Sequence, residues 1–253
     1  MKLIHQSKSM FEQQPETLRE KIQSLAAESV RQGNPSGWFE TLYAQAEGDS
    51  ARVPWAKNLT HPYLQEWLER YGPEGEGKSA LVIGCGLGDD AEALAQQGFQ
   101  VTAFDISPTA IAWCQQRFPN SSVNYLVADL FALDPQWHRR FNLVYECRNI
   151  QALPLSVRSK VISAIAPLVT EGGMLLVITR FRDTDTEPDG PPWPLSEQEL
   201  TQFEQSGLRE IHRDVFLETD DAVNKRGSND IENLVHLHEA CHKQEHSKSK
   251  LKA

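Results

Sequence analysis

The chain has 253 residues, and its 25 basic against 35 acidic residues give a formal net charge of −10. This length allows one α/β domain with a substantial core, and the acidic charge disfavours DNA or RNA as a substrate because phosphates attract basic surfaces. Four scattered cysteines without a C-x-x-C pair predict reduced thiols in a cytoplasmic protein, and no apolar run is long enough to predict a membrane span.

The N-terminal part predicts helices. Residues 15–32 form an amphipathic pattern, with Leu18, Ile22 and Leu25 on one face. A loop rich in turn residues and aromatics is expected from there to Trp55, then a second helix over 62–71. We therefore expect residues 1–77 to form a helical extension.

From residue 78 onward, apolar strands alternate with helical patterns, which predicts parallel strands joined by crossover helices. Two last strands, without a helix between them, are expected to pair antiparallel at the sheet edge. The predicted core covers residues 78–246, and residues 247–253 are expected to form a flexible tail. The predicted strands are 79–83, 100–105, 123–128, 141–146, 173–179, 208–217 and 234–241, and the helices are 89–97, 107–117, 154–168 and 196–206.

The first predicted strand runs directly into a turn with glycines at 84, 86 and 88, and the next strand ends in Asp105. Such glycines let backbone N–H groups approach a ligand closely, and an acid at this place can accept both hydroxyls of a ribose. Three interpretations compete: a structural loop, a nicotinamide site and an S-adenosylmethionine site. A dinucleotide fingerprint fits only from Gly86 to Ala91, which would place Gly84 inside the strand.

A third predicted strand ends in Asp129. Its carboxylate can accept the exocyclic amine of adenine, so that Asp105 and Asp129 would hold one adenosine between them. The alternative for Asp129 is a helix cap.

These segments resemble the class I S-adenosylmethionine-dependent methyltransferases in order and spacing over about residues 78–180. The resemblance implies an α/β fold with a Rossmann-like, seven-stranded, mostly parallel sheet, an antiparallel last strand and helices on both faces. It also implies S-adenosyl-L-methionine as the cofactor. The segments that carry it are Leu81–Gly88, Phe104–Ser107, Ala128–Leu130, Phe141–Glu146 and Leu168–Ile178.

Two flanking segments carry a narrower resemblance. Gly37-Trp38 with Pro54-Trp55, and the Gly-Pro-Pro-Trp run from Gly190 to Trp193, are similar to the thiopurine S-methyltransferase and thiol/halide methyltransferase group. The resemblance implies that the N-terminal aromatics cover the cofactor and that the second loop lies at the substrate mouth. Trp38 and Trp193 are therefore the candidate substrate-binding residues.

The cofactor site expected from the motifs and the resemblance lies at the carboxyl ends of the strands. Trp55 can contact the sulfonium by a cation–π interaction, or it only packs a loop on the core. The expected cofactor-binding residues are Trp55, Gly84, Cys85, Gly86, Gly88, Asp105, Ile106, Asp129, Leu130 and Glu146.

The catalytic residues are not determined by the sequence. The candidates are Glu146, Arg148 and Arg180, and surface ion pairs are the alternative role of the two arginines. Because no residue stands out as a general base, the sequence favours a thiol or another good nucleophile.

The predicted function is S-adenosylmethionine-dependent methyl transfer to a small-molecule acceptor. The alternatives are a non-catalytic S-adenosylmethionine-binding protein and an NAD-binding oxidoreductase. No nucleic-acid, membrane or metal partner is expected, because the histidines at 236, 238, 242 and 246 fit a strand with one polar face better than a metal site. The acceptor and the oligomeric state do not follow from the sequence.

Overall fold

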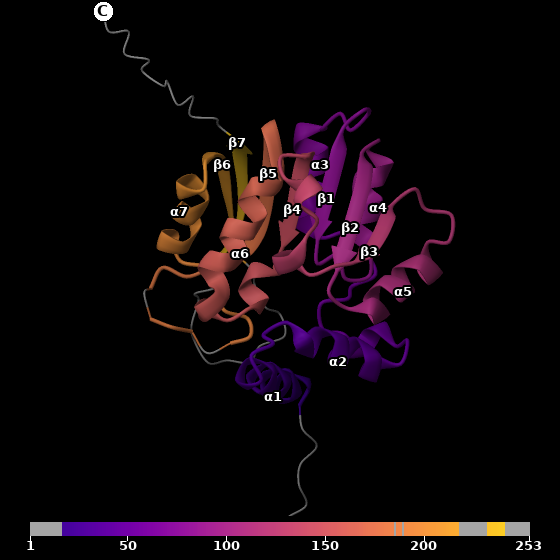
Figure 1. Ribbon diagram of the computed structural model, residues 1–253, viewed down its shortest axis with the longest axis vertical. Coiled ribbons are helices and arrows are strands. Elements are labelled where there is room, and N and C mark those ends of the chain that lie inside the picture. The colour runs from indigo at the N-terminus through magenta and orange to yellow at the C-terminus, as the bar shows by residue number, and fades with distance from the viewer. Residues whose placement is uncertain (1–16, 185, 189, 218–231, 241–253) are drawn as a thin grey trace, which may run out of the picture.

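One twisted sheet organises the chain, and the computed structural model describes residues 17–184, 186–188, 190–217 and 232–240 (Figure 1). The strand order is β3-β2-β1-β4-β5-β7-β6. The pairs β1–β2, β1–β4, β2–β3 and β4–β5 are parallel, which confirms the predicted α/β fold with a five-stranded parallel core. The strands are β1 (Ser79–Ile83), β2 (Gln100–Asp105), β3 (Asn124–Val127), β4 (Phe141–Cys147), β5 (Val169–Phe181), β6 (Leu208–Leu217) and β7 (Glu232–Ala240).

Strand β7 lies between β5 and β6 and runs antiparallel to both. Its backbone pairs Leu176 of β5 with Leu237 and Val215 of β6 with Leu234. The histidine pattern falls on side chains of β7 and on the segment after it, which lie outside the described residues.

Seven α-helices are described, and 3₁₀ turns connect several of them with the strands. The α-helices are α1 (Leu18–Arg31), α2 (Gly37–Ala46), α3 (Pro62–Tyr71), α4 (Asp89–Gln96), α5 (Pro108–Arg117), α6 (Arg158–Ile165) and α7 (Glu197–Gln205). The 3₁₀ turns are η1 (Ser50–Arg52), η2 (Leu130–Ala132), η3 (Pro135–Trp137), η4 (Ile150–Ala152), η5 (Leu155–Val157) and η6 (Ala166–Leu168).

Two predictions about helices were wrong. Helix α2 occupies part of the segment predicted as a loop before Trp55. The single helix predicted over 154–168 is divided into η5, α6 and η6. Pro154 and Pro167 lie at the two ends of this segment, and a proline lacks the N–H that continues an α-helical ladder.

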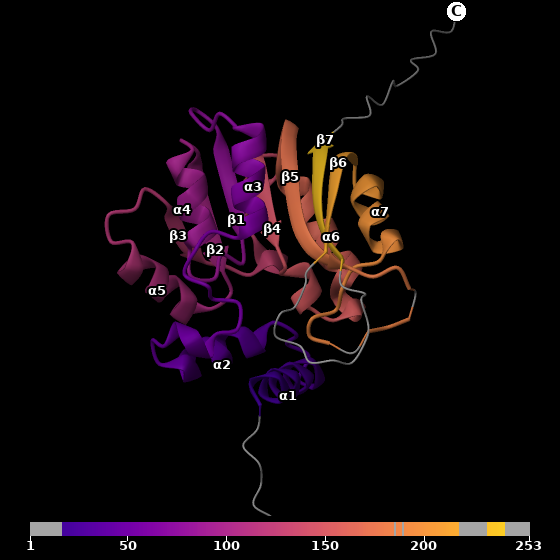
Figure 2. The same ribbon diagram turned by 180° about the vertical axis from the view of Figure 1, so that it is seen from behind.

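Two apolar layers enclose the sheet because side chains of a strand alternate between its faces. Ala80 and Val82 of β1 pack with α3, α4 and α5, whereas Leu81 and Ile83 pack with α6 and α7. Figure 1 views the sheet from the side of α6, and Figure 2 from the side of α3. This double cover leaves the ends of the strands as the place where a ligand can reach the sheet.

Helices α1 and α2 lie side by side below the sheet in both views (Figures 1 and 2). Glu40 of α2 bonds with Ser107, two residues after the end of β2, so α2 lies at the carboxyl ends of the parallel strands. Among the described residues, no helix is long and apolar enough to cross a membrane.

Candidate functional site

The loop that follows β1 has the backbone that its glycines allow. Gly86 and Gly88 have φ angles of 55° and 89°, in the left-handed region that L residues rarely adopt. A Cβ on Gly88 would lie 2.6 Å from the Tyr125 hydroxyl, and a Cβ on Gly86 would lie 3.3 Å from the Tyr43 hydroxyl. A side chain at Gly88 would therefore clash, and one at Gly86 would be tight and conformationally strained.

Asp105 connects this loop to the start of α5. Its buried carboxylate accepts hydrogen bonds from the N–H of Gly86 at 3.0 Å and from the N–H of Ser107 at 2.9 Å. Burial raises the pKa of Asp105 to about 6, although these N–H donors favour the charged form. A carboxylate in this position is fixed toward the loop, and its remaining lone pairs can accept further hydroxyls.

Glu146 lies at the end of β4, next to β1 in the sheet, and its side chain is fully buried. One oxygen, Oε1, accepts from the N–H of Asn149 at 2.6 Å and from the N–H of Ile150 at 2.9 Å. The other oxygen, Oε2, has no hydrogen-bond partner among the described residues. Burial raises the pKa of Glu146 to about 7, so the group changes charge near neutral pH.

Arg148 directly follows β4, and Arg180 lies near the end of the neighbouring strand β5. Arg148 has a φ of 62°, an uncommon conformation for a residue with a side chain, and its N–H donates to Ile178 O at 2.8 Å. The N–H of Arg180 donates to Oε1 of the buried Gln151 at 2.5 Å. Backbone hydrogen bonds therefore fix both arginines at the strand ends, as the sequence predicted for their position.

Aromatic side chains from α2 and the following loop form a cluster at the same rim, which we call the aromatic roof: Trp38, Phe39, Tyr43 and Trp55. Trp38 stacks on Phe39 at a centroid distance of 4.1 Å and meets Trp55 edge-on at 5.8 Å. The Trp55 indole N–H donates to the Tyr43 hydroxyl at 2.7 Å. Trp38 is buried, whereas Trp55 keeps 39% of its surface exposed. Trp55 is therefore the member of the roof that is open to a ligand.

Trp193 contacts the roof region from the loop between β5 and α7. It packs with Trp38 and Leu42 in one apolar cluster. Its backbone N–H donates to Gln151 O at 2.6 Å, and its carbonyl accepts from Arg158 Nη2 at 2.9 Å. The structure thus brings the two candidate substrate-binding residues, Trp38 and Trp193, together.

The other predicted cofactor residues have plainer surroundings. Asp129 is exposed, and its carboxylate caps η2 by accepting from Phe131 N–H at 2.9 Å. Ile106 and Leu130 are partly buried, the latter against the apolar layer under α6. Hydrogen bonding with Cys114 and burial raise the pKa of Cys85 well above its ordinary value, which favours a packing role for this thiol.

Three functional candidates escaped the sequence analysis. Glu40 of α2 bonds with Ser107 and Thr109, and Asp90 of α4 accepts from the His61 N–H at 2.7 Å and the Tyr145 hydroxyl at 2.9 Å. Arg158 lies buried beneath Trp193 and pairs with Glu199 at 3.2 Å. No sequence motif marks these contacts, because each joins segments that are far apart in the chain or depends on burial.

The same segments match known proteins. Residues 45–240 match the model of the thiopurine S-methyltransferase family. The chain belongs to this family. The family and its relatives use S-adenosylmethionine, which decides among the three interpretations of the glycine loop in favour of this cofactor.

Two relatives of the family show how far the likeness extends. A probable thiol methyltransferase 2 of Arabidopsis thaliana is 29% identical over 66% of this chain and 70% of its own length. A thiopurine S-methyltransferase of Aliivibrio salmonicida is 26% identical over 63% of this chain and 84% of its own length. The chain is thus an S-adenosylmethionine-dependent methyltransferase by family, as predicted.

Solved structures support the fold. The N-methyltransferase NodS of Bradyrhizobium japonicum, in complex with S-adenosylhomocysteine, aligns with a TM-score of 0.59 at 20% identity, over 79% of this chain and 98% of that chain. A protein solved in a study of disulfide-to-thioacetal conversion during echinomycin biosynthesis aligns with a TM-score of 0.63 at 21% identity, over 81% and 92%. At this identity, the likeness concerns the fold.

The site fits the cofactor in two respects. The glycine loop disfavours side chains beside Tyr43 and Tyr125, as expected of a loop that approaches a ligand by its backbone. Glu146 Oε2 is buried without a partner among the described residues, and an ammonium or hydroxyl donor would satisfy it.

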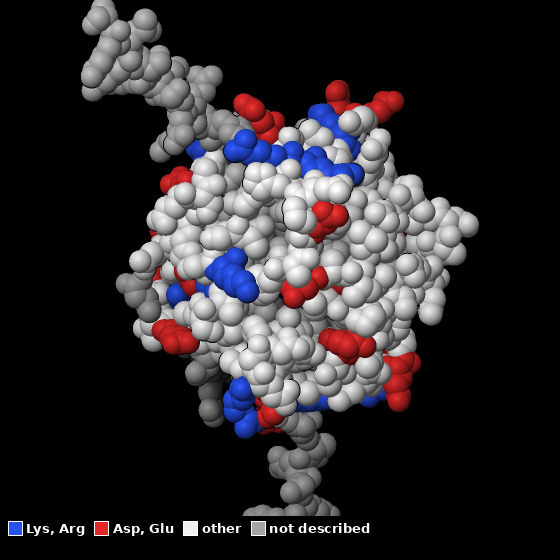
Figure 3. All heavy atoms as spheres, viewed as in Figure 1, with Lys and Arg blue, Asp and Glu red and all other residues white. Residues whose placement is uncertain are grey.

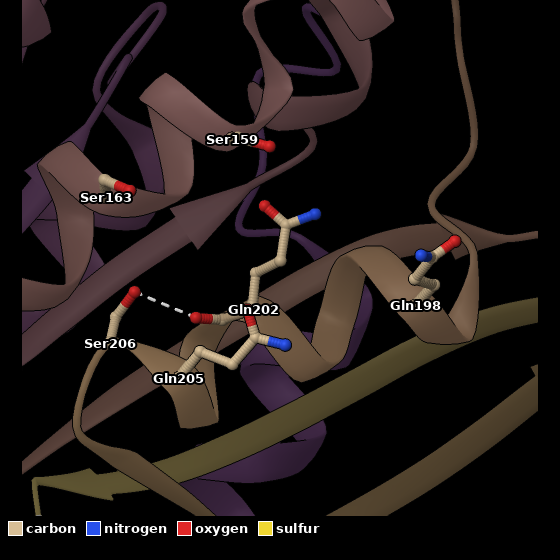
Figure 4. A pocket seen from close by; sticks show the side chains of 6 residues that line it. All are labelled: Ser159, Ser163, Gln198, Gln202, Gln205 and Ser206. Carbon is tan, nitrogen blue, oxygen red and sulfur yellow. Dashed lines mark hydrogen bonds between the residues drawn. The ribbon is translucent and has the colours of Figure 1, made fainter.

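A separate hollow of about 470 Å³ lies between α6 and α7 (Figure 4). Its walls carry only uncharged polar side chains and include no residue of the glycine loop or the aromatic roof. These are Ser159, Ser163, Gln198, Gln202, Gln205 and Ser206. We assign the chemistry to the strand ends, where the buried carboxylates lie.

Proposed function

We propose that the protein transfers the methyl group of S-adenosylmethionine to a sulfur atom, or to a similarly good nucleophile, of a small molecule. The observation that carries this proposal is the match of residues 45–240 to the thiopurine S-methyltransferase family. The acceptor named for two relatives, a thiol or a thiopurine, supports sulfur as the acceptor atom.

The residues that would hold the cofactor surround the glycine loop. Asp105 is placed to bind the ribose hydroxyls, and Asp129 the adenine amine, while Glu146 Oε2 can accept a hydrogen bond from the ammonium of the methionine part. Trp55 is 39% exposed and belongs to the aromatic roof, where its ring can favour a positive charge. When bound, the cofactor supplies an electrophilic methyl group on a sulfonium ion.

The acceptor would lie between the aromatic roof and the end of β4. Trp38 and Trp193, which belong to one apolar cluster, would border the acceptor, and Arg148 and Arg180 can orient an anionic group there. Glu146, already a catalytic candidate from the sequence, can serve as a proton acceptor, because its pKa of about 7 suits proton transfer at neutral pH. A thiol, which is already partly ionised, needs only this modest help.

A small acceptor agrees with the surface of the molecule. On the face shown in Figure 3, several basic side chains gather along the upper edge, and acidic side chains are dispersed over the rest. A net charge of −10 also opposes binding to a phosphate backbone. Within this proposal, residues 1–77 cover the site and residues 78–246 form the catalytic core. The proposed location is the cytoplasm.

The test is label transfer from methyl-labelled S-adenosylmethionine to a panel of thiols, thiopurines, phenols and amines. Methylation of thiols with the highest kcat/KM is the expected result. Calorimetric titration with S-adenosylhomocysteine accompanies the panel. Binding without transfer to any acceptor would instead identify a non-catalytic binder, and methylation restricted to amines or phenols would contradict sulfur as the acceptor.

A further inference from the structure

Glu40 makes a concentrated set of contacts between the N-terminal helices and the core. Its carboxylate accepts from the Ser107 hydroxyl at 2.5 Å, the Thr109 hydroxyl at 2.7 Å and the Thr109 N–H at 3.2 Å. All three donors lie at the start of α5, where the helix presents free N–H groups and its dipole favours a negative charge. A carboxylate from one segment therefore meets donors of another segment that is 67 residues away.

Ser107, which contacts Glu40, also contacts Asp105, the acid predicted to bind the ribose. Ser107 donates its hydroxyl to Glu40, while its own backbone N–H donates to Asp105 Oδ1 at 2.9 Å. Asp105 in turn accepts from Gly86 in the glycine loop. Glu40, Ser107, Asp105 and Gly86 thus form one continuous hydrogen-bonded chain from α2 to the loop.

A second carboxylate holds the opposite end of the same segment. Residues 37–61, which we call the cover segment, carry the whole aromatic roof. The cover segment begins at α2 with Glu40 and ends at His61, whose N–H donates to the buried Asp90 of α4 at 2.7 Å. Its two ends are therefore bound to the first turns of α5 and α4, the two helices that flank the glycine loop.

The roof itself adds few polar contacts with the core. Trp55, 39% exposed, is held by Tyr43 and by ring contacts with Trp38 and Phe39. These partners all belong to the cover segment. The position of the roof over the strand ends thus depends on what fixes α2 to the core.

We propose that Glu40 is a positioning residue that fixes the aromatic roof over the cofactor site. It touches neither of the reacting groups and acts through Ser107 and the start of α5. This role rests on the proposed function in one respect, namely that the roof covers a cofactor. The attachment of α2 to the core does not require a ligand.

The test compares Glu40→Gln with the wild type in two measurements. The first is hydrogen–deuterium exchange of residues 37–46 in the ligand-free protein, and the second is the Kd of S-adenosylhomocysteine by calorimetry. Glutamine keeps the size of the side chain but removes its charge and one acceptor, so we expect faster exchange and a Kd raised roughly tenfold. Glu40→Asp, which restores the charge, is expected to recover part of the affinity.

Glu47→Gln is the matched control. It makes the same chemical change at the end of α2, where the Glu47 side chain is 81% exposed and only pairs with Arg52 at 3.5 Å. Both measurements are expected to stay at wild-type values in this variant.

The outcomes separate this proposal from the proposed function. Unchanged exchange in Glu40→Gln, or faster exchange with an unchanged Kd, would overturn the role of Glu40 while the methyltransferase proposal stands. A wild-type protein that binds no S-adenosylhomocysteine would overturn the proposed function, and with it the positioning role toward the cofactor.

Discussion

Replacing Glu146 by glutamine is expected to change how the stability of the protein depends on pH. The wild-type side chain is fully buried, and burial raises its pKa from the ordinary 4.5 to about 7. A carboxyl group with a raised pKa binds its proton more tightly in the folded state than in the unfolded state. Its ionisation therefore destabilises the fold progressively between pH 4.5 and 7, and this cost is complete above pH 7.

The size of the effect follows from the two pKa values. At 1.36 kcal/mol for each pKa unit, ionisation of Glu146 costs the folded state about 3 kcal/mol, most of which falls between pH 5 and pH 8. Glutamine cannot ionise, and its Oε1 can still accept from Asn149 and Ile150. The stability of Glu146→Gln relative to the wild type should therefore rise by about 2–3 kcal/mol from pH 5 to pH 8.

Urea denaturation of both proteins at pH 5, 6, 7 and 8 measures this difference. Taking the difference at each pH removes the titration of Asp90 and Asp105, which both proteins share. A constant difference across this range would refute the reasoning, because it would mean that Glu146 has an ordinary pKa. We also expect the variant to lose most of its methyl transfer, so that stability and activity move in opposite directions.

Three further substitutions test the site. Asp105→Asn should weaken the binding free energy of S-adenosylmethionine by about 1.5–3 kcal/mol in calorimetry; unchanged affinity with an intact fold would exclude the ribose role. Gly86→Ala places a Cβ 3.3 Å from the Tyr43 hydroxyl at a φ of 55° and should lower the thermal stability by about 1–2 kcal/mol and weaken cofactor binding. Trp193→Ala should raise KM for the acceptor with little change in S-adenosylmethionine affinity; the opposite pattern in steady-state kinetics would show that Trp193 covers the cofactor instead.

The parts of the site that the sequence predicted are those that are continuous along the chain. The glycine loop directly follows β1, and Asp105 ends β2, so that hydrophobic runs and glycine spacing are enough to place them. The parallel order of the sheet follows from the same alternation of strands and helices.

Helix α2 illustrates why other parts could not be predicted. The Asn-Pro-Ser-Gly run at 34–37 is typical of a turn, and the helix has no side-chain cap at its start. Its stability comes from burial of Trp38, Leu42 and Tyr43 and from the contact of Glu40 with α5. These tertiary contacts outweigh the local signals, and no local pattern contains them.

The raised pKa of Glu146 could not be predicted for a related reason. Glutamate at the end of a strand has an ordinary pKa unless the fold buries it, and only the structure shows that Oε2 of Glu146 is enclosed. Chemical type can be read from the chain, but the environment that changes the chemistry cannot.

In the proposed cofactor site, the raised pKa values of three buried carboxyl groups would also affect how strongly cofactor and product bind. Asp90, Asp105 and Glu146 have pKa values of about 6, 6 and 7, all raised by burial. Near pH 6.5 these carboxyl groups are therefore partly protonated. Binding of a cation would release protons from them into the buffer. S-adenosylmethionine carries one positive charge more than S-adenosylhomocysteine, so acidification weakens its binding more than that of the demethylated product. Product inhibition should thus strengthen as the pH falls from 7.5 toward about 6, which makes turnover sensitive to the acidity of the surroundings.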